Sequence, residues 1–361
     1  MYRSFSIENF RGITSLKLAQ LSKVNVLTGL NDAGKTSVLE ALFLHASGPQ
    51  AGIAAIQTLL PSRRQELIAL QPSKESPWRT FFHNFDTDHS IVFNATGSPA
   101  AYRVELKPDL KSSPFAVYSG EGRADNSATN ASGLSIKVTP SKGMPKQYWQ
   151  TILTQSTNLG AVGQNLTVQF QLDPENAPAK IPAVILKSGL AADLATAYSQ
   201  YLLSPSSLNL LQALQIIDQR IEELQVLVVG GRAQLHARVN GVLTLFQLLG
   251  DGPNAMAQNF LAIATAKAGI VLIDEVGVGV HHSALPAMWH ALIEASDQLG
   301  VQLFATTHSQ ESVLAAQSAI KKAHDLSVYR LSRPSANAGT EVTSYSGLVL
   351  EAAAELNAEL R

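Results

Sequence analysis

Apolar residues along this chain follow two patterns that favour different elements. Short, largely apolar runs at 24–27, 270–273 and 301–305 are typical of buried strands. The first run is followed by apolar residues at helical spacing, at Val38, Leu39, Leu42 and Phe43. Further helices are predicted over 253–268 and 283–299. This succession of strands and helices predicts an α/β fold.

The region from 86 to 180 has a different pattern. The segments "HSIVFNA", "AYRVEL", "LSIKV" and "LTVQFQL" alternate or are rich in β-formers, with Gly, Ser, Pro and Asn between them. The stretch 111–133 is expected to be a long loop. An inserted antiparallel β-subdomain is therefore predicted.

The next segment, 187–224, is predicted to form two short helices separated at "LSPSS". Its apolar positions are Leu208, Leu211, Leu214, Ile217, Ile221 and Leu224. We expect these helices to form a hairpin arm that is too short for a long coiled coil.

Composition excludes several classes of protein. The 361 residues carry a net charge of −1, so no overall basic field points to nucleic acid. The chain has no cysteine, which excludes disulfides, thiolate zinc sites and cysteine nucleophiles. No apolar run approaches the length of a membrane span. A soluble, cytoplasmic protein is expected.

The strongest local signal is "GLNDAGKT" at 29–36, which matches the phosphate-binding pattern G-x-x-x-x-G-K-[ST]. It lies between a predicted strand and a predicted helix, as this loop must. Its backbone amides and the helix N-terminus favour anions. Lys35 is suited to neutralising the β- and γ-phosphates, and Thr36 to coordinating Mg²⁺.

Two adjacent acids give the loop a partner. Asp274 and Glu275 end the apolar run at 270–273. A P-loop site needs a second strand whose terminal acid holds magnesium, usually through water. Asp274 fits that role, and Glu275 is placed to act as general base toward the attacking water.

The order of the motifs resembles a known class of ATPase. The P-loop is followed by "GDG" at 250–252, by the two acids and by "ATTHS" at 305–309. This order resembles an ABC-type ATPase head. With "IENFRGI" at 7–13, the chain resembles the RecF, SMC-like and OLD-family ATPases. It is most similar to the OLD family and to its stand-alone relatives in bacterial defence systems, over residues 1–46 and about 245–310.

The resemblance implies a role for each matching residue. It implies that ATP phosphates and Mg²⁺ are held by Asn31, Asp32, Ala33, Gly34, Lys35, Thr36 and Ser37. Thr36 and Asp274 would be the metal ligands, and the catalytic residues would be Glu275, Lys35 and His308, the last contacting the γ-phosphate. Gly250, Asp251 and Gly252 would face ATP bound to a second subunit. A homodimer or larger oligomer with ATP between its heads is implied.

The sequence departs from the family pattern in two places. Pro253, Asn254 and Ala255 stand where an arginine commonly follows "GDG", and Gly277, Val278 and Gly279 stand where Glu-Asn-Gly is usual. Because the base is retained, slow hydrolysis is expected. The glutamine that links nucleotide to the β-subdomain has three candidates, Gln50, Gln57 and Gln65.

Combining the motifs with the element pattern gives a domain plan. The fold class expected is an α/β P-loop NTPase with an ABC-type head, an antiparallel β-subdomain and a short helical hairpin. The ATPase head is assigned to 1–85 and 225–361, the β-subdomain to 86–180 and the helical arm to 181–224.

The resemblance implies an ATPase that controls an effector on another chain, a nuclease or a toxin, in anti-phage defence. Only 53 residues follow His308, too few for a typical appended Toprim nuclease, and "LVLEAAAELNAELR" is expected to be a partner-docking helix. The main alternative is a RecF-like protein that binds DNA in repair. A transporter's nucleotide-binding subunit and a sensor that binds ATP with little turnover are further alternatives.

Overall fold

The structure is a computed structural model of residues 1–361. It describes 1–54, 58–59, 77–109, 117–118, 124–125, 132–140, 148–157, 165–171, 181–187, 193–204, 208–335, 339–347, 349–350 and 352.

A six-stranded sheet forms the centre of the molecule, with strand order β11-β15-β16-β3-β17-β18. Its strands are β3 (Val24–Thr28), β11 (Ala183–Leu186), β15 (Ile270–Ile273), β16 (Gln302–Thr306), β17 (Leu326–Ser332) and β18 (Glu341–Ser346). Neighbouring strands are parallel except that β18 runs antiparallel to β17. The three apolar runs predicted as strands are β3, β15 and β16, and every residue in them is buried.

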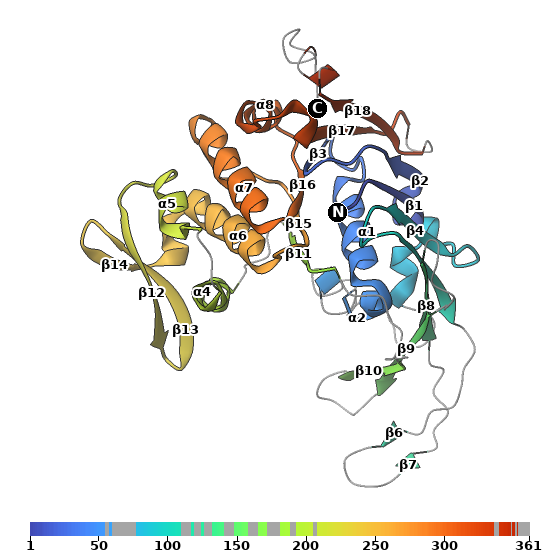
Figure 1. The fold of residues 1–361 in the computed structure, drawn as a ribbon. Coiled ribbons are helices and arrows are strands. Elements are labelled where there is room, and N and C mark those ends of the chain that lie inside the picture. The colour runs from blue at the N-terminus through green and yellow to red at the C-terminus, as the bar shows by residue number, and fades with distance from the viewer. Residues whose placement is uncertain are drawn as a thin grey trace.

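The two faces of this sheet support two separate cores, which explains why its strands are apolar almost throughout. Leu272 and Phe304 face the core that contains α1 (Lys35–Ser47). Val271 and Leu303 face the other core, which contains the remaining large helices. These are α6 (Asp251–Thr265), α7 (Leu285–Leu299) and α8 (Gln310–Ala319). Figure 1 shows α1 and α6 on opposite sides of the parallel strands.

A seven-stranded antiparallel sheet covers α1, with strand order β10-β9-β8-β5-β4-β1-β2. Its strands are β1 (Ser4–Phe10), β2 (Ile13–Leu18), β4 (Ile91–Thr96), β5 (Tyr102–Asp109), β8 (Ser132–Pro140), β9 (Tyr148–Thr157) and β10 (Asn165–Gln171). The N-terminal strand β1 pairs with β4, so the sheet extends across the expected boundary at residue 85.

Short helical elements lie between the larger elements. They are η1 (Gly48–Gln50), α2 (Ala51–Ala54), η4 (Pro77–Phe81), η5 (His83–Phe85), η7 (His282–Ala284) and η8 (Ala323–Asp325). Two small strands, β6 (Val117–Tyr118) and β7 (Ala124–Asp125), pair within the stretch expected to be a loop. The rest of that stretch up to residue 131 lies outside the described residues.

The predicted helical arm differs from the structure at its C-terminal end. Helices α4 (Leu194–Leu203) and α5 (Leu210–Gln215) form, and their buried residues belong to the core around α6. The helix predicted to continue through Leu224 instead ends at Gln215. A three-stranded antiparallel sheet follows, of β12 (Ile221–Val229), β13 (Arg232–Val239) and β14 (Val242–Leu245), and η6 (Phe246–Leu249) leads from it into α6.

The physical reason for this difference lies in two tight turns. Gly230 and Gly231 join β12 to β13, and Asn240 and Gly241 join β13 to β14. All four residues have positive φ, which matches the two-residue hairpin turns that right-twisted strands prefer. Val226, Val228 and Val229 then pair across the hairpin, and this pairing outweighs the helical spacing that ends at Leu224.

Among the described residues, no helix is both long and apolar enough to cross a membrane. The predicted C-terminal docking helix lies largely outside the described residues. The fold class predicted from the sequence, an α/β P-loop core with an antiparallel β-subdomain, is confirmed.

Candidate functional site

The carboxyl ends of four neighbouring parallel strands meet at one edge of the central sheet. The P-loop follows β3, Asp274 and Glu275 follow β15, Thr307 and His308 follow β16, and Lys187 follows β11. In open α/β sheets this edge is where ligands bind. The topology therefore brings the P-loop, the two acids and His308 to one edge, although 239 residues separate Lys35 from Asp274 in the sequence.

The P-loop adopts a backbone that its glycines permit. Gly29 has a φ of +137°, and a Cβ there would lie 2.2 Å from the carbonyl oxygen of Leu331. Gly34, with a φ of +96°, immediately precedes α1. The exposed first turn of α1 thus opens toward the site, as an anion-binding loop requires.

Lys35 is folded back across this loop. Its Nζ donates hydrogen bonds to the carbonyl oxygens of Gly29 at 2.8 Å and Leu30 at 2.9 Å. Burial lowers the pKa of Lys35, while the charges of Asp274 and Glu275 act in the opposite direction. The ammonium is therefore held at the loop by backbone oxygens and lies in the field of the two acids.

A hydroxyl and a carboxylate form the part of the site suited to a metal. Thr36 Oγ1 donates to Asp274 Oδ2 at 2.9 Å and lies 3.1 Å from Oδ1. These are hard oxygen donors of the kind that Mg²⁺ takes in nucleotide sites, where it also keeps several waters. The pair fits Mg²⁺, with Thr36 and Asp274 as its protein ligands.

Thr306 fixes the orientation of both acids. Its Oγ1 donates to Asp274 Oδ1 at 2.6 Å and accepts from the backbone N–H of Glu275 at 2.8 Å. Burial raises the pKa of Asp274, while the hydrogen bonds from Thr306 and Thr36 lower it and the charges of Glu275 and Glu40 raise it further. Thr306 was not among the site residues predicted from the sequence, although it ends β16 and belongs to the motif "ATTHS" at 305–309.

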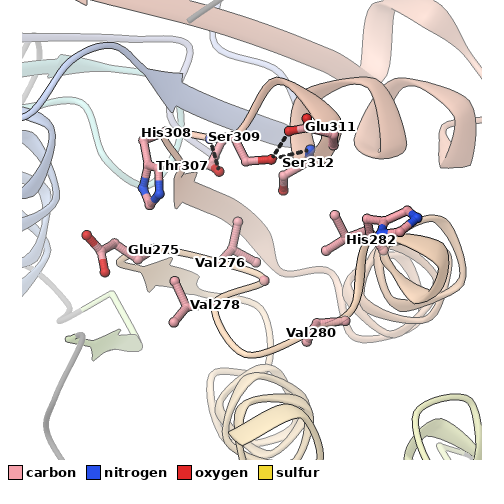
Figure 2. A pocket seen from close by; sticks show the side chains of 12 residues that line it. Glu275, Val276, Val278, Val280, His282, Thr307, His308, Ser309, Glu311 and Ser312 are labelled. Carbon is pink, nitrogen blue, oxygen red and sulfur yellow. Dashed lines mark hydrogen bonds between the residues drawn. The ribbon is translucent and has the colours of Figure 1, made fainter.

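Glu275 and His308 flank a pocket of about 420 Å³. Figure 2 shows them at one end of this pocket, with His282 at the other. Glu275 has a φ of +57°, uncommon for a residue with a side chain and worth a functional explanation. His308 is exposed and follows Thr307, whose backbone N–H bonds to Leu27 at 3.0 Å. The base and the histidine thus lie near each other. Among the described residues, no hydrogen bond joins Glu275 to His308.

The "GDG" residues at 250–252 lie next to the loop that follows the acids. A Cβ on Gly279, which has a φ of +78°, would lie 2.4 Å from the Asp251 Cβ, and a Cβ on Gly252 would lie 3.1 Å from the Gly279 carbonyl oxygen. Among the described residues, no hydrogen bond or ion pair joins 250–252 to the P-loop. Their contact with nucleotide in another subunit stays a prediction.

The other predicted residues have mixed environments. Asn31 and Asp32 are exposed, Ala33 is buried, and Ser37 is half-buried. Gln50 is exposed at the end of η1, and Gln57 and Gln65 lie outside the described residues, so none is placed at the site.

Comparison with known proteins gives a family match at the N-terminus. Residues 1–98 match the model described as AAA ATPase domain. The chain is 23% identical over 334 residues to an ATP/GTP phosphatase of Helicobacter pylori, covering 87% of this chain and 86% of that protein. It is also 34% identical over 89 residues to the DNA replication and repair protein RecF of Lachnoclostridium phytofermentans, covering 25% of this chain and 22% of RecF.

These matches support an ATPase of the AAA and RecF-like kind. An uncharacterized protein of Methanocaldococcus jannaschii is 46% identical over 50 residues, which is 14% of this chain and 23% of that protein. Among solved structures, an SMC head from Pyrococcus furiosus bound to the C-terminal domain of ScpA has a TM-score of 0.48 at 10% identity, covering 99% of this chain and 98% of that one. The SMC head domain from Thermotoga maritima has a TM-score of 0.40 at 10% identity, covering 95% and 98%. At this distance the SMC heads say nothing about function.

Proposed function

We propose that this protein is a magnesium-dependent ATPase whose slow hydrolysis controls a partner. The observation that carries the proposal is the set of bonds among Thr36, Asp274 and Thr306, which brings the P-loop helix and the acidic strand to one point. The AAA ATPase match at 1–98 supports the same activity.

The residues divide the chemistry between them. Lys35 and the loop amides would neutralise the β- and γ-phosphates, and Thr36 and Asp274 would hold Mg²⁺. Mg²⁺, when bound, stabilises the charge that develops on the phosphates. Glu275 would accept a proton from the attacking water, and His308, at the same end of the pocket, would contact the γ-phosphate.

Two substitutions test the hydrolytic site. Lys35→Ala removes the positive charge that faces the phosphates and should weaken ATP binding at least about tenfold. Glu275→Gln should retain binding and lower phosphate release roughly 100-fold or more. Phosphate release and fluorescent-nucleotide binding measure the two effects. Glu294→Gln on the exposed face of α7 is the matched control, and turnover unchanged in both site variants would contradict the assignment.

We further propose that ATP is held between two heads, with 250–252 of one chain facing the P-loop of the other. Lys35→Ala and Asp251→Arg should each abolish turnover alone. Mixing the two variants restores one complete site per heterodimer, so about a quarter of the wild-type activity should return on random exchange. Activity that stays at background after mixing would contradict the shared site.

The partner is proposed to be an effector such as a nuclease or toxin in an anti-phage defence system. The sequence resemblance to stand-alone OLD-family ATPases supports this role. A tagged Glu275→Gln protein should retain its ATP-bound state and recover the effector from the native host with MgATP. Recovery with ADP equal to that with MgATP would contradict nucleotide control.

The match to RecF over 89 residues favours one alternative, an ATP-dependent DNA-binding protein in recombination or repair. This alternative predicts duplex binding that requires ATP and weakens steeply with salt. Fluorescence anisotropy with labelled duplex, with and without MgATP, separates it from the effector proposal.

A further inference from the structure

The imidazole of His308 faces the nucleotide site from the short segment between β16 and α8. His308 is exposed, and Figure 2 shows its ring at the same end of the pocket as Glu275. The part of the chain that the structure describes offers this ring no hydrogen bond or ion pair. The orientation of the ring therefore depends on how firmly the backbone on either side of His308 is held.

Thr307 holds this backbone on both sides. The residue is 3% exposed, and its backbone N–H donates to the Leu27 carbonyl at 3.0 Å. Its Oγ1 accepts a hydrogen bond of 3.1 Å from the backbone N–H of Ser309. A threonine hydroxyl that bonds to the backbone two residues further on closes a tight turn. One buried residue thus fixes the backbone before and after His308.

The bond to Leu27 relates His308 to the P-loop. Leu27 lies on β3, two residues before Gly29, and β3 is the parallel neighbour of β16. The hydrogen bond continues this strand pairing one residue beyond the end of β16 at Thr306. The position of His308 relative to the loop proposed to hold the phosphates is therefore set by the central sheet.

The turn after His308 is anchored on its other side by α7 and α8. Ser309 Oγ accepts from the backbone N–H of Ser312 at 3.1 Å and so caps the first turn of α8. Ser312 is 1% exposed, and its Oγ accepts from Trp289 Nε1 of α7 at 3.1 Å. Removing the hydroxyl of Thr307 would leave both anchors in place and free only the backbone at His308.

We propose that Thr307 is a positioning residue for ATP hydrolysis, because its hydroxyl holds His308 where the imidazole contacts the γ-phosphate. The inference rests on the proposed ATPase function and deepens it. Thr307 is itself buried, so it acts on the phosphates only through His308. Lys35 and Thr36 would still hold the nucleotide and its Mg²⁺ without it. Loss of the hydroxyl should therefore slow turnover more than it weakens binding.

Three variants separate the hydroxyl from the shape of the side chain. Thr307→Val keeps the shape and removes the acceptor, so phosphate release should fall about three- to tenfold. The dissociation constant of a fluorescent non-hydrolysable ATP analogue should change less than about twofold. Thr307→Ser keeps the hydroxyl and should restore most of the turnover. Thr265→Val at the C-terminal end of α6 is the matched control, because it removes a hydroxyl that donates to the Leu261 carbonyl at 2.8 Å.

A double variant tests whether Thr307 acts through His308. His308→Ala alone should lower turnover, and adding Thr307→Val to it should have no further effect, since the ring that Thr307 positions is gone. A hydroxyl that only stabilises the fold would lower turnover by the same factor in both backgrounds. Circular dichroism establishes folding for each protein. Thr307→Ala, which removes the hydroxyl without adding an atom, replaces Thr307→Val if the latter fails to fold.

Wild-type turnover in Thr307→Val would overturn the inference, as would a further loss of the same factor on top of His308→Ala. If His308→Ala hydrolyses ATP like the wild type, the imidazole has no role that Thr307 could support. The inference then fails without affecting the roles of Lys35 and Glu275. If the wild-type protein releases no more phosphate than Lys35→Ala, the proposed ATPase function fails, and the inference with it.

Discussion

His45 shows how a residue away from the site ties the fold to pH. Its ring is completely buried between the N-terminal strand and β5 and stacks on Tyr102 with the ring centroids 4.3 Å apart. Nδ1 accepts from the Tyr2 hydroxyl at 2.8 Å, which leaves Nε2–H to donate to the Tyr102 carbonyl at 3.0 Å. This arrangement suits the neutral imidazole, and burial lowers the pKa of His45 from 6.5 to about 4.

A stability loss in mild acid follows from this pKa. The unfolded chain binds the proton below pH 6.5 and the folded chain only below about pH 4. Stability is therefore complete above 6.5 and declines as pH falls toward 4, by up to roughly 3 kcal/mol from this group. Urea denaturation across this range should show a shallower decline in His45→Gln, whose amide keeps both hydrogen bonds. An equal decline in both proteins would contradict the assignment.

Thr306 provides a second prediction at the residue scale. Its hydroxyl bonds both to Asp274 and to the backbone of Glu275, so Thr306→Val leaves both acids without their shared partner. We expect phosphate release to fall roughly tenfold or more, since a hydrogen bond to a charged group contributes about 1.5–3 kcal/mol. Thr306→Ser retains the hydroxyl and should retain most activity. Full activity in Thr306→Val would show that another group orients the acids.

At the scale of elements, the loop after Glu275 packs against the start of α6. Gly279 lies so close to Asp251 that there is no room for a Cβ on Gly279. This contact joins the loop that carries the base to the residues proposed to face a second subunit. The departure at 277–279 thus touches Asp251 and Gly252, and the departure at 253–255 follows these two residues directly in the sequence.

Gly279→Ala should therefore affect assembly more than nucleotide binding. Its Cβ would meet Asp251 Cβ at 2.4 Å, and its φ of +78° adds backbone strain of about 1 kcal/mol or more. We expect ATP-dependent dimerisation, measured by light scattering in the Glu275→Gln background, to be lost. Gly300→Ala is the matched control, because Gly300 also has a positive φ of +64° but no atom within 4 Å of the added Cβ. Equal dimerisation in both variants would contradict the coupling.

The elements that could be predicted from sequence are those with a local cause. The P-loop, β15 with its acids and β16 were predicted because each combines an apolar run with polar residues at its end. The strands β12 to β14 were not predicted, because apolar residues at helical spacing continue to Leu224. The signals for the strands are the turn residues at Gly230–Gly231 and Asn240–Gly241, which lie further along the chain. The ion pair of Glu40 with Lys187 could not be predicted, since 147 residues separate the two and neither belongs to a motif.

At the scale of the whole molecule, nucleotide binding should stabilise the fold. The site draws on strands from both ends of the chain, so a bound ligand opposes unfolding of the central sheet as a unit. At an ATP concentration about 100 times the dissociation constant, linkage predicts about 2.7 kcal/mol. For a chain of this size the melting temperature of Glu275→Gln should rise by roughly 2–4 °C with MgATP. The shift should vanish in Lys35→Ala, and an equal shift there would show binding elsewhere.

The central sheet also places β3 between two strands from the far end of the chain. β3 ends at Thr28, but its neighbours β16 and β17 begin at Gln302 and Leu326. During synthesis at about 5–20 residues per second, the strand that carries the P-loop waits roughly 15–50 s for the first of these neighbours. Until then its apolar residues lack their partners and are open to chaperones or to premature association. The proposed nucleotide site therefore becomes complete only after β16 has been synthesised, and a product truncated before Gln302 would carry the P-loop without this neighbouring strand.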